Sequence, residues 1–397
     1  MGKVVSKLQQ KLSSEHRRTA KFPFGELPDV CKVHVFSYLS VDDRVLAARV
    51  CSEWRHLLSA PALWTSVDVP SSVRAVLSSQ QADKHQEAGV YHNHVRKFMA
   101  FIGRVDPCIR RFVFVGDIAE TVYHDSLRSF VTRARLSELK YASINWAKDM
   151  SESEVRRHED CISSWSIDEN HRRRQRHFVH LFEQLCHAAP SLTSLSLPFD
   201  WSSRSVDALV RLCKLEELSL GRYSELQPLD AVTLDRVISG LPRLRRLELE
   251  VWTPCASGGL TYYGLHSKSL EFVDLSRCRG FAVGHVDLPK ARIMKLSRCL
   301  WSGPLMVQNT LDVYSLPCLH RVLSDGAPNL EELNGHKLPA DWCEHVDDEF
   351  ESLLKSLCPC ELHYGWESVV VDCFWILITS RHTGNVWLWI EHSARLV

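Results

Sequence analysis

The chain has 397 residues, of which 45% are hydrophobic and 24% are charged. This composition is typical of folded globular proteins and leaves room for two or more domains. Lysine plus arginine and aspartate plus glutamate number 48 each, so the overall charge gives no reason to expect a nucleic-acid partner.

The fourteen cysteines are scattered through apolar stretches, and the N-terminus lacks the apolar core of a secretory signal. We therefore expect reduced, buried thiols in a cytoplasmic protein, with the nucleus as an open alternative. The strongest apolar run, from Val369 to Ser380, has only twelve residues and contains Asp372. It is too short to span a membrane.

The first residues, MGKVVSKLQQKL, fit the N-myristoylation pattern M-G-x-x-x-[ST] through Gly2 and Ser6. They resemble the acylated N-termini of Arf-type GTPases and neuronal calcium sensors. One acyl chain binds a membrane only marginally, so stable membrane contact needs a second signal. The basic residues that could supply it are Lys3, Lys7, Lys11, Arg17, Arg18 and Lys21. The alternative is a solvated basic tail over residues 1–22.

The stretch LPDVCKVHVFSYL, residues 27–39, predicts a short helix that is apolar on two sides. The stripe that we expect to pack onto the helix's own domain consists of Cys31, Val35, Tyr38 and Leu39. The opposite side carries Val30, Val33 and Phe36. A unit of about forty residues has too little interior to bury both sides, so we expect this second side to meet another surface.

Two further helices are predicted before residue 65. Ser40 stands in an N-cap position with Asp43 three residues later, and an apolar stretch follows. Trp54 and the two leucines that follow it have helical spacing, and Pro61 ends that helix.

The segment from Leu27 to Trp64 resembles an F-box in its Leu-Pro start, its V-F-x-x-L and V-C-x-x-W motifs and its closing Leu-Trp pair. The resemblance implies an F-box-like domain over residues 23–68 that binds a Skp-family adaptor and, through it, cullin and RING subunits. The predicted adaptor-binding residues are Leu27, Pro28, Val30, Val33, Phe36, Leu39, Trp54, Leu63 and Trp64. The resemblance leaves open which of them face the domain's own core. A three-helix cap that seals a following domain is the alternative.

After a linker and a helix at residues 69–104, the pattern L-x-x-L-x-L recurs. Clear copies begin at Leu192, Leu215, Leu244 and Leu270, with starts 23, 29 and 26 residues apart. Weaker copies begin at Ile109, Leu136 (continuing with Leu139 and Tyr141), Ala291 and Leu330. Alternating apolar residues predict a short strand in each copy, and the stretches between copies have helical spacing.

One strand and one helix in about 20 to 29 residues is typical of leucine-rich repeats. We therefore predict an α/β fold: a three-helix F-box-like module followed by an irregular leucine-rich-repeat solenoid over residues 105–340. Two copies end in Cys278 and Cys299. They resemble cysteine-containing leucine-rich repeats, which implies buried, non-catalytic thiols at these positions.

Residues 148–176 are dense in charge and predict an exposed loop or helix inserted into the solenoid. An electrostatic contact with an acidic target, a phosphate or a nuclear importer is the alternative. Residues 341–397 predict a C-terminal cap with a β-hairpin around RHTG, and ligand binding by Trp387 and Trp389 is the alternative. The residue types that zinc prefers occur at Cys343, His345, Cys358, Cys360 and His363. Because they form no C-x-x-C pair, we expect no metal site.

We find no phosphate-binding glycine loop, nucleophile elbow or H-E-x-x-H motif, so we predict a non-catalytic protein without a cofactor. The predicted function is substrate recognition for an SCF-type ubiquitin ligase, in which proximity of target and ubiquitin drives conjugation. The residues predicted to contact an unknown protein target are Ser194, Ser196, Glu217, Ser219, Arg246 and Glu248. The alternative is a myristoylated, membrane-associated scaffold without a ligase role.

Overall fold

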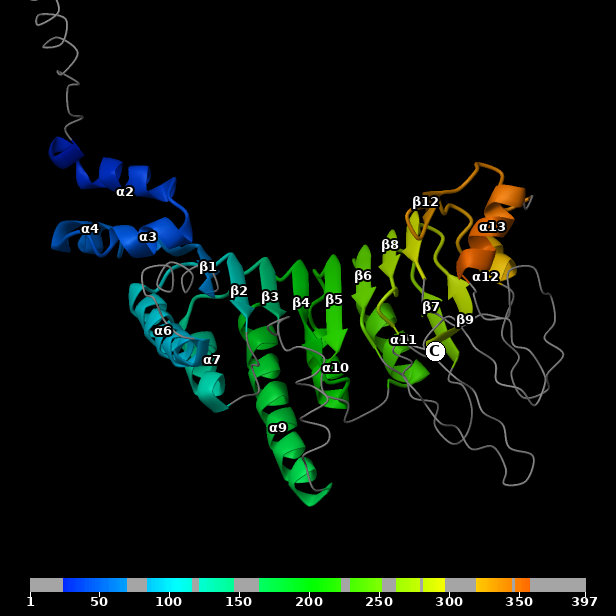
Figure 1. Cartoon of the computed structure of the whole chain (residues 1–397), viewed down its shortest axis with the longest axis horizontal. Coiled ribbons are helices and arrows are strands. Elements are labelled where there is room, and N and C mark those ends of the chain that lie inside the picture. The colour runs from blue at the N-terminus through cyan, green and yellow to red at the C-terminus, as the bar shows by residue number, and fades with distance from the viewer. Residues whose placement is uncertain are drawn as a thin grey trace, which may run out of the picture.

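The computed structural model describes residues 24–69, 84–115, 121–145, 164–222, 229–251, 262–278, 281–296, 319–344 and 347–357. They form an N-terminal helical unit followed by a long sheet whose strands run in chain order, with helices on one face (Figure 1). The architecture is therefore α/β, as predicted. The predictions for the basic tail with Gly2, for residues 148–163 and for the C-terminal hairpin lie outside the described residues.

The N-terminal helical unit contains the three predicted helices. They are α2 (Asp29–Ser37), α3 (Val41–Ala47) and α4 (Ser52–Leu57), flanked by the 3-10 turns η1 (Phe24–Glu26) and η2 (Pro61–Trp64). The predicted N-cap is confirmed, because the Ser40 hydroxyl accepts a hydrogen bond from the backbone N–H of Asp43 at 3.1 Å. The Cys51 thiol caps α4 in the same way.

Ten strands form the main sheet, in the order β1-β2-β3-β4-β5-β6-β8-β10-β11-β12. They are β1 (Ser66–Asp68), β2 (Arg111–Val115), β3 (Tyr141–Asn145), β4 (Ser194–Phe199), β5 (Glu217–Arg222), β6 (Arg246–Leu249), β8 (Phe272–Asp274), β10 (Ile293–Lys295), β11 (Glu332–Leu333) and β12 (His336–Lys337). Every neighbouring pair from β1 to β11 is parallel. Each of the eight predicted copies contributes one of these strands.

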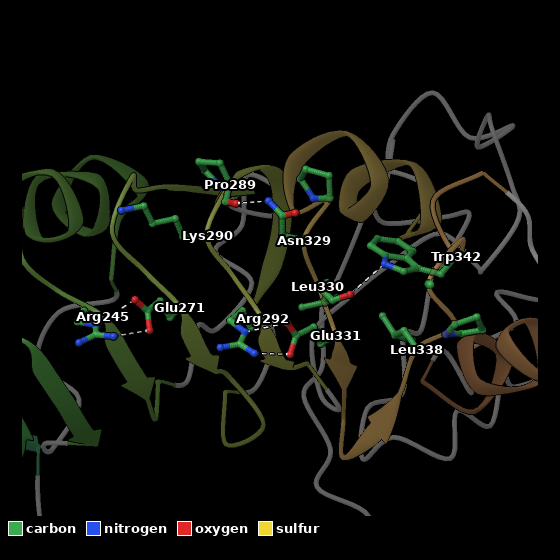
Figure 2. A pocket seen from close by; sticks show the side chains of 13 residues that line it. Arg245, Glu271, Pro289, Lys290, Arg292, Asn329, Leu330, Glu331, Leu338 and Trp342 are labelled. Carbon is green, nitrogen blue, oxygen red and sulfur yellow. Dashed lines mark hydrogen bonds and ion pairs between the residues drawn. The ribbon is translucent and has the colours of Figure 1, made fainter.

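The last pair, β11 and β12, is antiparallel and joined by a tight turn at Asn334 and Gly335. Both residues have positive φ, 51° and 87°, which asparagine and glycine adopt most readily. Beyond this turn, the buried Trp342 donates an indole hydrogen bond to the Leu330 carbonyl at 3.0 Å (Figure 2). Its ring contacts Phe350 of α13 (Asp348–Leu357), with 5.6 Å between centroids. The segment after the sheet thus packs against the last strands.

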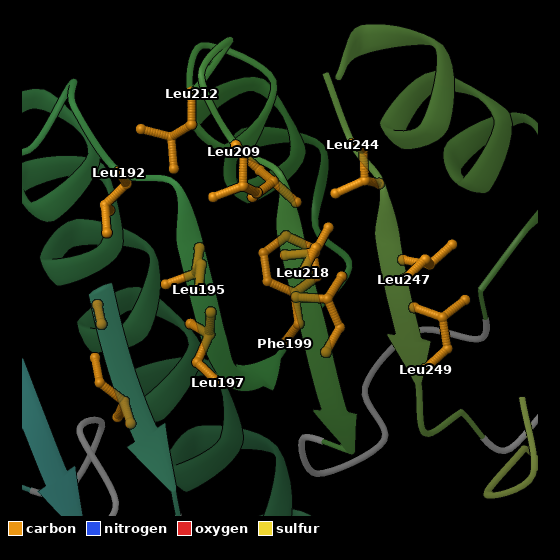
Figure 3. Packing of buried hydrophobic residues seen from close by; sticks show 14 of the residues in the cluster. Leu192, Leu195, Leu197, Phe199, Leu209, Leu212, Leu218, Leu244, Leu247 and Leu249 are labelled. Atoms are coloured by element: carbon orange, nitrogen blue, oxygen red, sulfur yellow. The ribbon is translucent and has the colours of Figure 1, made fainter. Parts of the chain in front are cut away.

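Buried side chains form a continuous row along the sheet. The row that the strand register defines is Val67, Phe112, Ala142, Leu195, Leu218, Leu247, Val273, Met294 and Leu333, and each is at most 2% exposed. Figure 3 shows this packing between β4, β5 and β6. The central apolar residue of each repeat therefore packs against those of the neighbouring repeats.

The predicted phase of one weak copy is wrong. Tyr141 aligns with Ser194, and Ala142 aligns with Leu195, so the copy is Leu139-Ala142-Ile144 rather than Leu136-Leu139-Tyr141. A small alanine occupies the place of the central leucine, which hid the true phase. Tyr141 instead lies on the opposite, outward face of the sheet, where it is half-buried.

Helices cover one face of the sheet in a single layer (Figure 1). They are α6 (Lys84–Val105), α7 (Thr121–Arg133), α9 (Ser164–Ala188), α10 (Ser203–Leu209), α11 (Ala231–Gly240) and α12 (Leu319–Gly326). None of the helices within the described ranges is long and apolar enough to cross a bilayer. The charged residues 164–176 belong to α9, where the His177 ring stacks on His124 of α7 at 4.2 Å. Part of the predicted insertion is thus a packed helix.

The prediction of one helix per repeat is wrong for two repeats. Between α11 and α12 the layer continues as a two-stranded parallel sheet, β7 (Tyr262–His266) and β9 (Ala282–Asp287). Apolar residues alternate in these stretches, as at Tyr263 and Leu265, which is the period of a strand. The end of α12 approaches β9 closely, since a Cβ on Gly326 would lie 2.0 Å from the Val286 carbonyl oxygen.

We expect Leu247→Ala to lower the free energy of unfolding by about 2–5 kcal/mol, because it opens a cavity in a fully buried row. Chemical denaturation followed by circular dichroism measures this change. The exposed Arg243 lies just before the same strand, and Arg243→Ala should change stability by less than about 0.5 kcal/mol. Equal losses in the two variants would contradict the role of the row.

Candidate protein-binding surfaces

Three aromatic rings form the centre of the N-terminal helical unit. Phe36 of α2 is 3% exposed and contacts Trp54 of α4 and Phe24 of η1, with ring centroids 5.2 and 5.6 Å away. Phe24 and Trp54 also contact each other edge-on. Phe36, which the sequence placed on the partner-facing side of the helix, is therefore a core residue.

A buried lysine explains why the inner face of α2 is not the one predicted. Lys32 lies one helical turn before Phe36 and is 5% exposed. Its ammonium group donates to Glu53 of α4 at 2.7 Å and lies 3.8 Å from Asp29. The hydrogen bond to the Glu53 carboxylate raises the pKa of Lys32. With its charge paired, the lysine packs inward and the apolar residues beside it turn outward.

The outward face of α2 is apolar. The predicted inner stripe is wrong at Val35 and Tyr38, which are 43% and 79% exposed, and Cys31 is exposed as well. Val30, predicted to face outward, is 80% exposed. The exposed large hydrophobic residues of this unit are Val30, Val35, Tyr38, Leu46 and Val50. Elsewhere in the described chain only Val232 and Tyr262 are comparably exposed, so this unit holds most of the uncovered apolar surface.

Two residues predicted to bind the adaptor lie in the core instead. Leu63 and Trp64 are each 2% exposed. The indole of Trp64 donates to the Leu58 carbonyl at 2.7 Å, and its ring contacts Phe98 and Phe101 of α6. Trp64 therefore joins the helical unit to the layer that covers the sheet.

Arg44 of α3 holds the helices of this unit together. Its guanidinium donates to the carbonyls of Phe36 and Ser37 at the end of α2, at 3.2 and 2.8 Å. A third hydrogen bond goes to the carbonyl of Leu63 in η2. One cation thus binds three carbonyls at the C-terminal ends of two helical segments, where the helix dipole favours a positive charge.

The outward face of the main sheet is the second candidate surface. The six predicted target-contact residues lie there in two adjacent rows, Ser194–Glu217–Arg246 and Ser196–Ser219–Glu248, across β4, β5 and β6. The Ser194 hydroxyl donates to Glu217 at 2.9 Å, and Arg246 donates to Glu248 at 2.9 Å. The register thus unites the six residues, and their role in target binding stays a prediction.

Sequence reasoning missed the aromatic residues of this face. Tyr141 and Phe272 point outward from β3 and β8, and an arginine of the preceding strand stacks on each ring. Arg111 lies 4.1 Å from the Tyr141 centroid, and Arg246 lies 3.7 Å from that of Phe272. In the sequence, these residues could have been found as aromatic residues at the x positions of the L-x-x-L-x-L pattern, which face outward from the strands.

A groove of about 780 Å³ follows the edge at which β6, β8, β10 and β11 begin (Figure 2). Its floor carries two bidentate ion pairs, Arg245–Glu271 and Arg292–Glu331, with N–O distances of 2.8 to 3.0 Å. Each arginine lowers the pKa of its glutamate partner. Three of the four residues are exposed and Glu271 is half-buried, so these pairs link adjacent repeats with only modest energy.

The thiols of the described chain are only partly buried, contrary to the expectation: Cys186 and Cys278 are buried, whereas Cys31, Cys51 and Cys213 are exposed. Cys278 is fully buried, as predicted, and burial raises the pKa of its thiol to about 12. Its Sγ–H donates to the Leu249 carbonyl at 3.4 Å. Cys343 donates to the Pro328 carbonyl. Cys299 and the other zinc candidates lie outside the described residues, within which no three ligand side chains converge on a metal position.

The helical unit, with its aromatic centre and outward apolar face, has a counterpart among known families. Residues 24–70 match the F-box-like family. The chain therefore carries an F-box-like domain, which agrees with the resemblance that its sequence motifs showed.

Curated relatives match the chain over short stretches. F-box/LRR-repeat protein 12 of Bos taurus is 44% identical over 46 residues, which are 12% of this chain and 14% of that protein. The protein of the same name from Homo sapiens is 46% identical over 44 residues, 11% and 14% of the two chains. F-box/LRR-repeat protein 21 of Ovis aries is 29% identical over 92 residues, 23% and 21%. The matched parts thus span only about a seventh to a fifth of these relatives.

We expect Arg44→Met to destabilise the F-box-like domain by about 2–3 kcal/mol, since three carbonyls lose a charged donor. Hydrogen exchange of the backbone amides in residues 28–69 measures this loss locally. Arg55→Met is the matched control, because Arg55 is exposed and donates one hydrogen bond, to the Ala48 carbonyl. Similar exchange in the two variants would show that Arg44 has no special role.

Proposed function

We propose that this chain is the substrate-recognition component of an SCF-type ubiquitin ligase. The observation that carries the proposal is the outward apolar face of α2 in the F-box-like domain, where Val30 and Tyr38 are about 80% exposed. An apolar face of this kind favours a protein partner. In F-box proteins that partner is a Skp-family adaptor, which links them to cullin and RING subunits.

The adaptor surface in this proposal differs from the one that the sequence suggested. Val30 stays a predicted contact and Tyr38 joins it as a central residue, whereas the buried Phe36, Leu63 and Trp64 are removed from this surface. Leu27, Pro28, Val33, Leu39 and Trp54 stay predicted contacts at its border, because each is half-buried or exposed. Burying the apolar side chains would supply about 25 cal/mol per Å².

The main sheet and its layer form a leucine-rich-repeat solenoid in this proposal, and the outward strand face holds a protein target. The in-register repeats and the names of the relatives, F-box/LRR-repeat proteins, support this assignment. The chain acts without a catalytic residue of its own. It raises the local concentration of a target lysine beside the ubiquitin-loaded conjugating enzyme. We place this activity in the cytoplasm.

We expect the double variant Val30→Asp, Tyr38→Asp to lose the Skp-family adaptor and the cullin in affinity purification from cells. Two carboxylates in the apolar interface would have to be desolvated without partners, so recovery should fall at least tenfold. Val232→Asp is the matched control, because Val232 is 78% exposed on α11 and far along the chain from α2. Immunoblotting quantifies both subunits.

The circular dichroism and thermal unfolding of both variants should match the unmodified chain, since the replaced side chains are exposed. If the unmodified chain recovers neither adaptor nor cullin, the proposed function is wrong. If the double variant recovers them normally, the proposed face of α2 is wrong.

Acylation at Gly2 stays a separate proposal, supported by the M-G-x-x-x-S start of the chain. We expect Gly2→Ala to abolish incorporation of a myristate analogue and to shift the protein from the membrane to the soluble fraction in cell fractionation. Ser6 stays intact in this variant, and Val4→Ala is the control for a change near the N-terminus, because it alters neither the acylation pattern nor a basic residue. If the Gly2→Ala variant is distributed between the membrane and soluble fractions as the unmodified chain is, the alternative of a myristoylated, membrane-associated scaffold is ruled out.

A further inference from the structure

One outward row of the main sheet contains a single pair of adjacent hydrocarbon side chains. The row consists of the first residue of each strand from β1 to β11 and reads Ser66, Arg111, Tyr141, Ser194, Glu217, Arg246, Phe272, Ile293 and Glu332. Phe272 and Ile293 stand side by side in the register of β8 and β10, and both are half-buried. An adjacent aromatic and aliphatic pair of this kind is the type of anchor at which interface energy concentrates.

Arg246 completes this site. Its guanidinium carbon lies 3.7 Å from the centre of the Phe272 ring, and its Nε and NH2 groups donate to Glu248 at 2.9 and 2.8 Å. On the other side, the Lys295 ammonium lies 5.5 Å from the same ring and 3.4 Å from Asp274. Both cations are therefore paired with a carboxylate of the sheet, which holds them in place around Phe272.

Glu217 gives the neighbouring part of the face a negative charge. In the described part of the chain, its carboxylate accepts a hydrogen bond from the Ser194 hydroxyl, and no basic side chain forms an ion pair with it. Arg246, which follows in the row, is directed to Glu248 and Phe272. From β5 to β10, the two outward rows hold the carboxylates Glu217, Glu248 and Asp274 against the cations Arg246 and Lys295. The net charge of this part is thus negative.

We infer that this face binds an extended protein segment that carries an apolar side chain and, three residues away, a lysine or arginine. The apolar side chain packs on Phe272 and Ile293, and the basic side chain pairs with Glu217. Glu217 on β5 and Phe272 on β8 are two strand spacings apart, about 10 Å. An extended segment that crosses the strands advances about 3.3 Å per residue, which gives the three-residue separation.

This inference rests on the proposed function, because it takes the outward strand face as the surface that holds the target. It names the class of target: a segment with one apolar anchor and one basic residue, in either chain direction. Acidic or phosphorylated target segments are disfavoured on this face, because Arg246 and Lys295 already have carboxylate partners. The carboxylate of Glu217 would also repel the negative charge of such a segment.

Panning a phage-displayed library of random peptides against the purified full-length chain tests the inference. We expect the selected peptides to share an aliphatic or aromatic residue three positions from a lysine or arginine. In fluorescence polarisation, Phe272→Ser with Ile293→Thr should weaken a selected peptide at least about tenfold. Glu217→Arg should reverse the preference, so that panning then selects an acidic residue at the basic position.

Val232→Ser is the matched control, since it removes an exposed apolar side chain on α11, on the helix-covered side of the sheet, and should leave the affinity unchanged. The inference would be overturned if the selected peptides lacked an apolar residue three positions from a lysine or arginine. It would also be overturned if the Glu217→Arg variant still selected a basic residue at that position. Peptide binding needs no adaptor, so failure of the panning alone would overturn only this inference. Failure to recover the adaptor from cells would overturn the proposed function.

Discussion

The unshifted register of the parallel strands is the constraint on which the rest of the structure depends. Each strand from β1 to β11 pairs with the next so that central apolar residues, such as Leu195, Leu218 and Leu247, align in one buried row. A repeat cannot bury its own apolar side chains alone, so each depends on both neighbours. The same register sets the outward rows, which is why Glu217 and Phe272 share one surface although they belong to different repeats.

A paired charge has the corresponding role in the F-box-like domain. Lys32 is buried against Glu53, and with its charge paired it lies on the inner side of α2, one turn before Phe36. Removing Glu53 would leave the buried ammonium group with only Asp29, 3.8 Å away, whereas the intact pair keeps Val30 and Tyr38 on the outer side. The surface that supports the proposed adaptor contact thus depends on a residue that does not belong to it.

The sequence predicted the α/β class, eight of the ten strands of the main sheet and the three short helices, because these depend on local apolar periodicity. It failed where a residue of unexpected type takes a structural position. Ala142 replaces a leucine in the buried row, and Lys32 occupies the inner side of α2. The pattern of apolar residues in α2 could not reveal the inward position of Lys32, because a charged lysine is normally assigned to the solvent-facing side of a helix. The pair Phe272 and Ile293 escaped notice because strand register, rather than nearness in sequence, brings it together.

Trp64 connects the two candidate surfaces physically. It closes the F-box-like motif, and it also begins an unrecognised copy of the repeat pattern, W-x-x-V-x-V, through Val67 and Val69. Val67 aligns with Phe112, so the main sheet starts within three residues of the last F-box landmark. With Trp64 packed on Phe98 of α6, no linker separates the domain from the sheet. Such a short junction fixes the position of one candidate surface relative to the other, which the proposed proximity mechanism requires.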